Sequence, residues 1–214
     1  MLKSVLYTPR AELSIDGGMK MVSEEYGSKV SLLTESYPRY GFDALSMLIR
    51  TGWDALCITR LHPEYVIKKY DLRGTDCLWL SSKKGKGVLS PRSLNQMVKA
   101  VKAALKNCQN VIIFLDGLEY MLMWNDMGKV ISTLREIDGL IRERNAEMLV
   151  CLDPLTLEQR DLERLELEFP TCSTTEVVEL LSSELSQRID EALPESAGQR
   201  ISGLLESTEL HVAP

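Results

Sequence analysis

The residues best suited to chemistry follow an apolar run that is typical of a buried strand. Asp116 comes directly after Val111–Leu115, and Glu119 lies three positions further on. A carboxylate at the end of an apolar strand is the pattern of a Walker B segment, in which the acid holds Mg²⁺. A turn or helix-capping role for Asp116, just before Gly117, explains the same pattern without any ligand.

A Walker B acid works beside a phosphate cradle, and the sequence offers none. Neither G-x-x-x-x-G-K-[ST] nor G-x-G-x-x-G occurs in the chain. The segment after the apolar run Val30–Thr34, where a phosphate loop would lie, is Glu35–Gly41, with one glycine, a proline and a carboxylate. Such a segment is not expected to wrap backbone amides around phosphates. We therefore expect no cofactor and no tight binding or hydrolysis of ATP.

A second polar group follows the apolar run Ala55–Thr59. Arg60 and His62 come directly after it, and Arg60 can bind Asp116 or an anionic ligand through two nitrogens. No G-x-S-x-G pattern accompanies His62, which argues against a hydrolase site. We assign no catalytic residue or metal ligand and expect the chain not to be an enzyme. The residues proposed as a polar cluster or ligand site are Arg60, His62, Asp116 and Glu119.

These residues depend on elements that the apolar pattern predicts. Continuous apolar runs indicate strands covered on both faces, and the segments between several of them have helical spacing. A short helix is expected at Pro63–Tyr70 and a helix start at Ser90–Pro91. Strands alternating with helices predict a three-layer α/β fold with a mainly parallel central sheet. The five runs taken as its strands are Val30–Thr34, Ala55–Thr59, Asp76–Leu80, Val111–Leu115 and Met148–Leu152.

The two ends of the chain extend this core. Ser4–Tyr7 reads as a further strand, followed by a helix that ends near Gly27. After Phe169 the pattern changes to an amphipathic helix, Ser173–Leu193. We therefore divide the chain into an α/β domain, residues 1–172, and a helical tail, residues 173–214. The tail either packs on its own domain or contributes to a dimer.

Charge is unevenly distributed in a chain of net charge −6. The segment Lys68–Lys106 contains only two acids, Asp71 and Asp76, and this favours a solvated basic face or a surface for an anionic partner. We argue against nucleic acid, because Trp79 lies inside a predicted strand and is expected in the core, and because the chain is acidic. The ten basic residues are Lys68, Lys69, Arg73, Lys83, Lys84, Lys86, Arg92, Lys99, Lys102 and Lys106.

The apolar runs and the cysteines indicate where in the cell the protein is found. The apolar runs are far shorter than the roughly 20 residues that span a bilayer, and no secretory signal is visible, so a cytoplasmic location is expected. The five cysteines contain no C-x-x-C pair, and neither a disulfide framework nor a zinc site is expected.

Several of these segments together resemble a known family. Gly52–Pro63, Trp79–Ser81, Leu115–Tyr120 and Asp153–Pro154 are similar, in that order, to the mainly archaeal domain of unknown function 835, over about residues 30–170. The core also looks like a RecA or KaiC-type ATPase fold that has lost its phosphate loop. Members of the family often lie beside sensor and histidine-kinase modules, which implies a role in signalling.

The function expected from these observations is that of a non-catalytic regulatory or interaction domain. It would act through protein contacts, as a homo-oligomer and in archaeal signalling. The alternative is a nucleotide- or small-anion-binding switch, or an enzyme, that uses the sheet edge without a phosphate loop.

Overall fold

The structure is a computed structural model of the 214-residue chain, and it describes residues 27–108 and 110–173. The predicted strand Ser4–Tyr7, the helix expected before Gly27 and the tail beyond Ser173 lie outside the described residues. The division of the chain at residue 172 therefore stays a prediction.

The described residues form one seven-stranded sheet in which every pair of neighbours is parallel. The strand order is β4-β3-β2-β5-β6-β1-β7, so that β5 lies in the middle and the C-terminal ends of the strands meet at one edge. The strands are β1 (Val30–Thr34), β2 (Asp54–Thr59), β3 (Asp76–Leu80), β4 (Val88–Leu89), β5 (Asn110–Asp116), β6 (Asn145–Leu152) and β7 (Thr171–Cys172).

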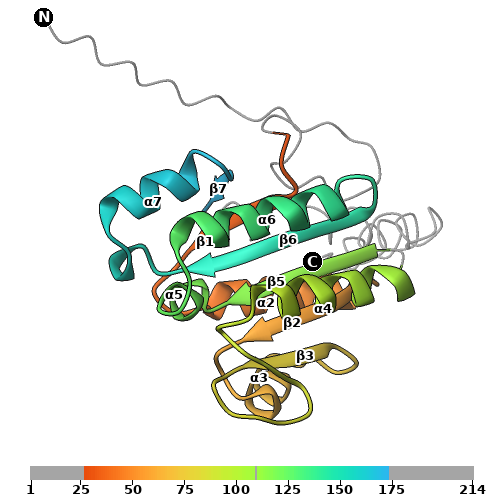
Figure 1. The fold of residues 1–214 in the computed structure, drawn as a ribbon. Helices are drawn as coiled ribbons and strands as arrows, with labels where there is room; N and C mark the ends of the chain where they lie inside the picture. The colour runs from red at the N-terminus through yellow and green to blue at the C-terminus, as the bar shows by residue number, and fades with distance from the viewer. Residues whose placement is uncertain (1–26, 109, 174–214) are drawn as a thin grey trace, which may run out of the picture.

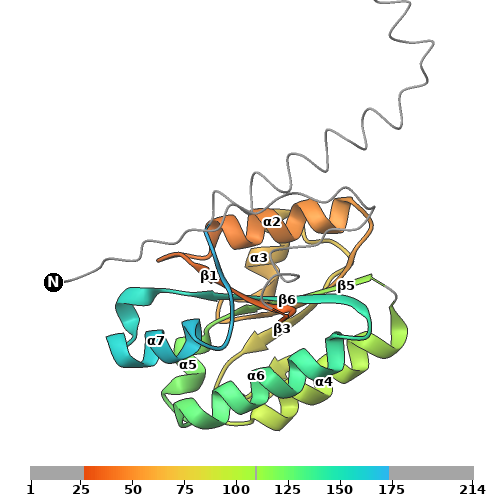
Figure 2. The same ribbon diagram turned by 90° about the horizontal axis from the view of Figure 1, so that it is seen from above.

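Helices cover both faces of the sheet (Figures 1 and 2). Two of them, α2 and α3, pack on one face, and α4, α5, α6 and α7 pack on the other. The expected three-layer α/β fold is thus confirmed. The helices are α2 (Arg39–Arg50), α3 (Pro63–Tyr70), α4 (Leu94–Asn107), α5 (Leu118–Leu122), α6 (Met127–Ile141) and α7 (Gln159–Glu166), with a 3₁₀ turn at Pro154–Thr156.

The apolar runs are continuous because each central strand contributes to two cores. Along β5, Ile113 and Leu115 face α4 and α6, whereas Ile112 and Phe114 face α2 and α3. All four side chains are at most 1% exposed. An alternating pattern would have left one face of the sheet polar, so the two helix layers follow from the run itself.

Four details differ from the prediction. The two-residue strands β4 and β7 were not expected, because a pair of residues carries no periodicity. Helix α4 begins at Leu94 and not after Ser90, because the chain first makes a turn in which the Ser93 amide donates to the Ser90 carbonyl. Thr156 and Gln159 have the spacing of a capping box, but the Thr156 hydroxyl donates to the Asp153 carbonyl and does not cap α7.

Within the two described ranges, we find no helix long and apolar enough to cross a membrane. This agrees with the short apolar runs of the sequence.

The first turn of α2 lies very close to the sheet at Gly41. A Cβ atom there would lie 2.5 Å from the Cys151 Sγ atom and 2.8 Å from both the Glu35 Oε1 and the Phe114 Cε2 atoms. By contrast, nothing lies within 4 Å of a Cβ atom placed on Gly139 in α6. Gly41 is therefore required by packing, and Gly139 is not.

We expect Gly41→Ala to lower the free energy of unfolding by about 1–3 kcal/mol, because the added methyl group overpacks the helix–sheet contact. The matched variant Gly139→Ala makes the same chemical change in open space and is expected to raise stability by up to ~1 kcal/mol. Urea unfolding followed by circular dichroism measures both. A Gly41→Ala protein as stable as the wild type would contradict this packing argument.

Candidate functional site

Asp116 ends β5 at the C-terminal edge of the sheet and is only 2% exposed. Its Oδ2 atom accepts a hydrogen bond from the Thr59 hydroxyl at 2.7 Å and one from the Arg60 amide at 3.3 Å. The Arg60 guanidinium lies 3.5 Å from Oδ1. Thr59 is the register neighbour of Asp116 on β2, so the parallel pairing itself brings these groups together. Both carboxylate oxygens are thus used within the protein.

Gly117 lets the Arg60 side chain lie across the end of β5. Its φ angle is +118°, and a Cβ atom at this position would lie 2.4 Å from the Arg60 Cγ atom. The Asp-Gly pair therefore has a positional role, since the acid binds the guanidinium and the glycine leaves room for its stem.

Glu35 occupies the place where a phosphate loop would hold an anion. Its two carboxylate oxygens accept hydrogen bonds from the amides of Tyr40 and Gly41, at 3.0 and 2.9 Å, in the first turn of α2. A helix N-terminus with free amides attracts anions, and here the chain's own carboxylate takes that position. No acidic residue lies within the first turn of α2 itself.

Glu119 and His62 have other partners. The Glu119 Oε1 atom accepts a hydrogen bond from the Asp153 amide at 2.7 Å, which ties α5 to the end of β6. Its Oε2 atom is buried and has no hydrogen-bond partner among the described residues. His62 is exposed at the start of α3, where its ring meets the edge of the Trp79 ring at 5.0 Å. Of the four predicted site residues, the structure joins Arg60 to Asp116 directly.

Sequence reasoning missed three residues of this edge. Thr59 and Glu35 bind the groups described above, and the only sequence signal for them is a polar residue at or just after the end of an apolar run. Trp79 was expected in the core and this is wrong, because its ring is partly exposed. Since β3 is next to the edge strand β4, the face of β3 that carries Trp79 is only partly covered.

An aromatic rim lies beside this edge, and we define it as Tyr37, Tyr40, His62, Tyr65, Lys69, Trp79 and Lys83. The Lys69 ammonium lies 5.2 Å from the ring centre of Tyr37 and 5.3 Å from that of Tyr65. The Lys83 ammonium lies 5.0 Å from the Trp79 ring. Burial and the neighbouring hydroxyls of Tyr65 and Tyr70 raise the pKa of Tyr37 to about 12, so this phenol stays protonated at neutral pH.

The ten basic residues between Lys68 and Lys106 are all exposed. Eight of them lie on α3, on α4 and in the segment from β3 to β4, and Arg73 and Arg92 lie in the connections before β3 and before α4. Because α3 and α4 cover opposite faces of the sheet, the basic segment Lys68–Lys106 is spread over both faces. Two of its residues, Lys69 and Lys83, belong to the aromatic rim.

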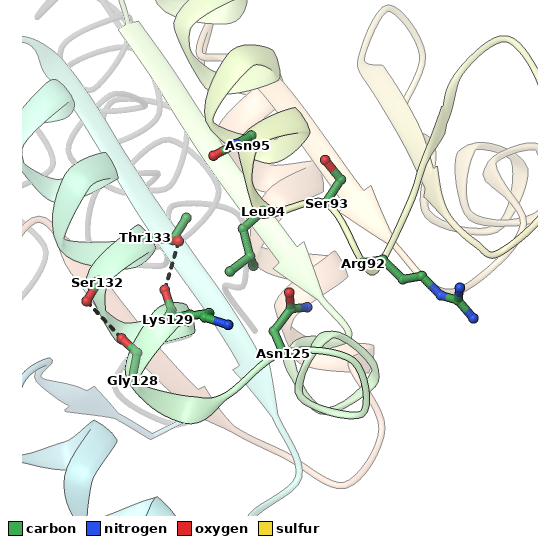
Figure 3. A pocket seen from close by; sticks show the side chains of 9 residues that line it. All are labelled: Arg92, Ser93, Leu94, Asn95, Asn125, Gly128, Lys129, Ser132 and Thr133. Carbon is green, nitrogen blue, oxygen red and sulfur yellow. Dashed lines mark hydrogen bonds between the residues drawn. The ribbon is translucent and has the colours of Figure 1, made fainter.

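A polar hollow of about 520 Å³ lies between the starts of α4 and α6 (Figure 3). Most polar side chains that line it are bonded to the chain itself. The Asn125 amide donates to the carbonyls of Pro91 and Met121, and the Ser132 and Thr133 hydroxyls donate to carbonyls one turn earlier in α6. The Lys129 ammonium lies 2.9 Å from the Asp126 carboxylate. We therefore describe this hollow as a surface feature and assign it no ligand.

No group of three or more histidine, cysteine or acidic side chains suited to a metal occurs among the residues that the structure describes.

The comparisons with known proteins identify a family whose function is unknown. The model of the family described as "Protein of unknown function (DUF835)" matches residues 35–169, and the chain belongs to this family. No curated protein matches the chain. A similar solved structure is titled "Structural study of Project ID PH0250 from Pyrococcus horikoshii OT3". It is 13% identical with a TM-score of 0.44, and the match covers 71% of this chain and 87% of that one.

The pKa of Glu35 gives a prediction about pH. Burial raises this pKa above its ordinary value of 4.5, the amide bonds from Gly41 and Tyr40 oppose the rise, and the charge of Asp116 adds to it. The folded chain therefore holds this proton more tightly than the unfolded chain, and ionisation of Glu35 costs stability as the pH rises through the raised pKa.

We expect the wild type to lose stability relative to Glu35→Gln as the pH rises above about 4.5, because only the wild type ionises there. Chemical unfolding of both proteins over a series of pH values measures the difference. Glu143→Gln, which changes an exposed glutamate after α6, should follow the wild type at every pH. A stability difference between wild type and Glu35→Gln that does not change with pH would contradict the assignment.

Proposed function

We propose that this chain is a non-catalytic regulatory or interaction domain that acts through protein contacts in the cytoplasm. The observation that carries the proposal is the state of the C-terminal edge of the sheet. Ligands of open α/β sheets bind at this edge, yet here Glu35, Asp116 and one oxygen of Glu119 are bonded to the protein itself. The edge is thus closed by internal bonds, and the aromatic rim beside it is exposed.

The composition of the rim supports protein binding. Tyr37, Tyr40 and Tyr65 are 45, 46 and 47% exposed, and tyrosine and tryptophan side chains are typical of binding hot spots. The contacts of Lys69 with two of these rings hold them in place before a partner arrives. Less conformational entropy is then lost on binding, which favours affinity.

Charge supports a second copy of the chain as one partner. The basic segment Lys68–Lys106 contrasts with the net charge of −6, so the remainder of the chain is strongly acidic. The predicted helix Ser173–Leu193 carries Glu176, Glu179, Glu184 and Asp190, whose charges complement the basic segment. We therefore include a homo-oligomer in the proposal. The proposal also includes the signalling role suggested by the family resemblance, and a core that is similar to RecA and KaiC-type ATPases.

We expect the full chain to self-associate at micromolar concentration in low salt and to dissociate as salt is added, because screening weakens the charge contacts. Sedimentation velocity measures the state. A chain ending at Ser173, which keeps β7 intact, should associate more weakly. Tyr65→Ala should weaken association by about 1–2 kcal/mol, whereas Leu155→Ala, at a side chain 87% exposed outside the rim, should not. A monomeric full chain in low salt would contradict the homo-oligomer.

We also expect no hydrolysis of ATP and no binding tighter than about 1 mM, since the α2 amides are occupied by Glu35. Calorimetric titration of the full chain with ATP and Mg²⁺ tests this. A micromolar dissociation constant that is lost in Asp116→Ala would favour the alternative, a nucleotide-binding switch or enzyme at the sheet edge.

A further inference from the structure

Two cysteines that are far apart in the sequence are direct neighbours in the sheet. Cys57 on β2 and Cys77 on β3 are register partners on parallel strands. Register partners point to the same side of a sheet, and both cysteines belong to the core that faces α2 and α3. The sequence shows no trace of this pair, because the helix α3 separates its members.

The geometry suits a covalent bond. Adjacent strands lie about 4.8 Å apart, which is within the range of about 4.4–6.8 Å between the Cα atoms that disulfides join. The two thiols are close enough to shift each other's pKa. Neither of these two cysteines is part of a disulfide in the structure.

The two thiols differ in reactivity. Cys57 is fully buried, whereas Cys77 is partly exposed. The neighbouring Cys57 thiol lowers the pKa of the Cys77 thiol, although burial and the nearby Asp76 oppose this. The Cys77 thiol, together with burial, raises the pKa of Cys57. Cys77 is therefore the thiol that meets a reagent first, and Cys57 is placed to attack second.

We propose that Cys57 and Cys77 form a reversible dithiol–disulfide site whose oxidant is a low-molecular-weight disulfide. The Cys77 thiolate attacks one sulfur of the small disulfide, forms a mixed disulfide and releases the first small thiolate. Cys57 then gives up its proton and attacks the Cys77 sulfur, which releases the second small thiolate. The two protein thiols are oxidised, the small disulfide is reduced to two thiols, and an excess of small thiol reverses both steps.

Oxidation at this position would affect the aromatic rim, although neither cysteine belongs to the rim. The disulfide closes a loop of chain that contains Arg60, His62, Tyr65 and Lys69. It also links β2 to β3, the two strands that α3 connects. The site is independent of the proposed protein-binding function, because it rests on the strand register alone.

The experiment treats the folded full chain with glutathione disulfide and counts free thiols after denaturation. We expect the count to fall from five to three, a peptide map to link Cys57 to Cys77, and the thermal midpoint of the oxidised protein to rise. Reduced glutathione in excess should restore all five thiols.

Two serine variants provide the controls. In Cys77→Ser the link cannot form, and the thermal midpoint should not change on treatment with glutathione disulfide. Cys108→Ser, at the end of α4, should still form the Cys57–Cys77 link. The proposal is overturned if folded wild type keeps all five thiols, stops at a mixed disulfide, or links other cysteines in preference to this pair.

Discussion

A carboxylate buried in the middle of a sheet has to find its hydrogen bonds inside the protein, and the arrangement of the sheet edge depends on how Asp116 does so. Its strand lies between β2 and β6 and is covered by helices on both faces, so solvent does not reach it. Hydrogen bonds from Thr59 and Arg60 meet this requirement. Arg60 is held in turn because its carbonyl accepts a hydrogen bond from the Trp79 indole at 3.1 Å. One buried charge thereby sets the positions of the first residues after β2 and of the ring on β3.

Glu35, on the other side of β5, provides the hydrogen-bond acceptor that the first amides of α2 require. The first amides of a helix have no partner within the helix, and α2 has neither a side-chain cap at Pro38 nor an acid in its first turn. Glu35 reaches these amides from the end of β1 and so replaces the anion that a phosphate loop would bind. The Cys151 thiol also donates a hydrogen bond to the Glu35 Oε1 atom, at 3.5 Å. The sequence lacks a phosphate-binding pattern, and in the structure the Glu35 carboxylate occupies the amides that such a pattern would offer to a phosphate.

The core of the fold was predictable because a strand buried on both faces has a continuous apolar run in its sequence. All five predicted strands and the short helix Pro63–Tyr70 occur, with strand ends moved by at most a few residues. The pair β3–β4 and the neighbours Cys57 and Cys77 were not predictable, because strand order and register decide them and neither has a local signal. The sequence did nominate Arg60 as a partner of Asp116, and this pair occurs. It could not predict that Thr59 also binds Asp116 or that Glu119 binds the Asp153 amide. Trp79 was misplaced since a strand near the end of a sheet looks the same in sequence as a central one.

The two ends of the described sheet have a consequence for how this protein can assemble. Both terminal strands, β4 and β7, are only two residues long. An exposed edge of that length offers few free backbone groups, so another chain gains little by adding a strand there. Edge-to-edge growth of the kind that leads to fibrils is therefore disfavoured at both described edges, although the interior strands are long and strongly apolar. Short edge strands thus favour recognition through side chains, whose identity can be selective in a way that backbone pairing is not.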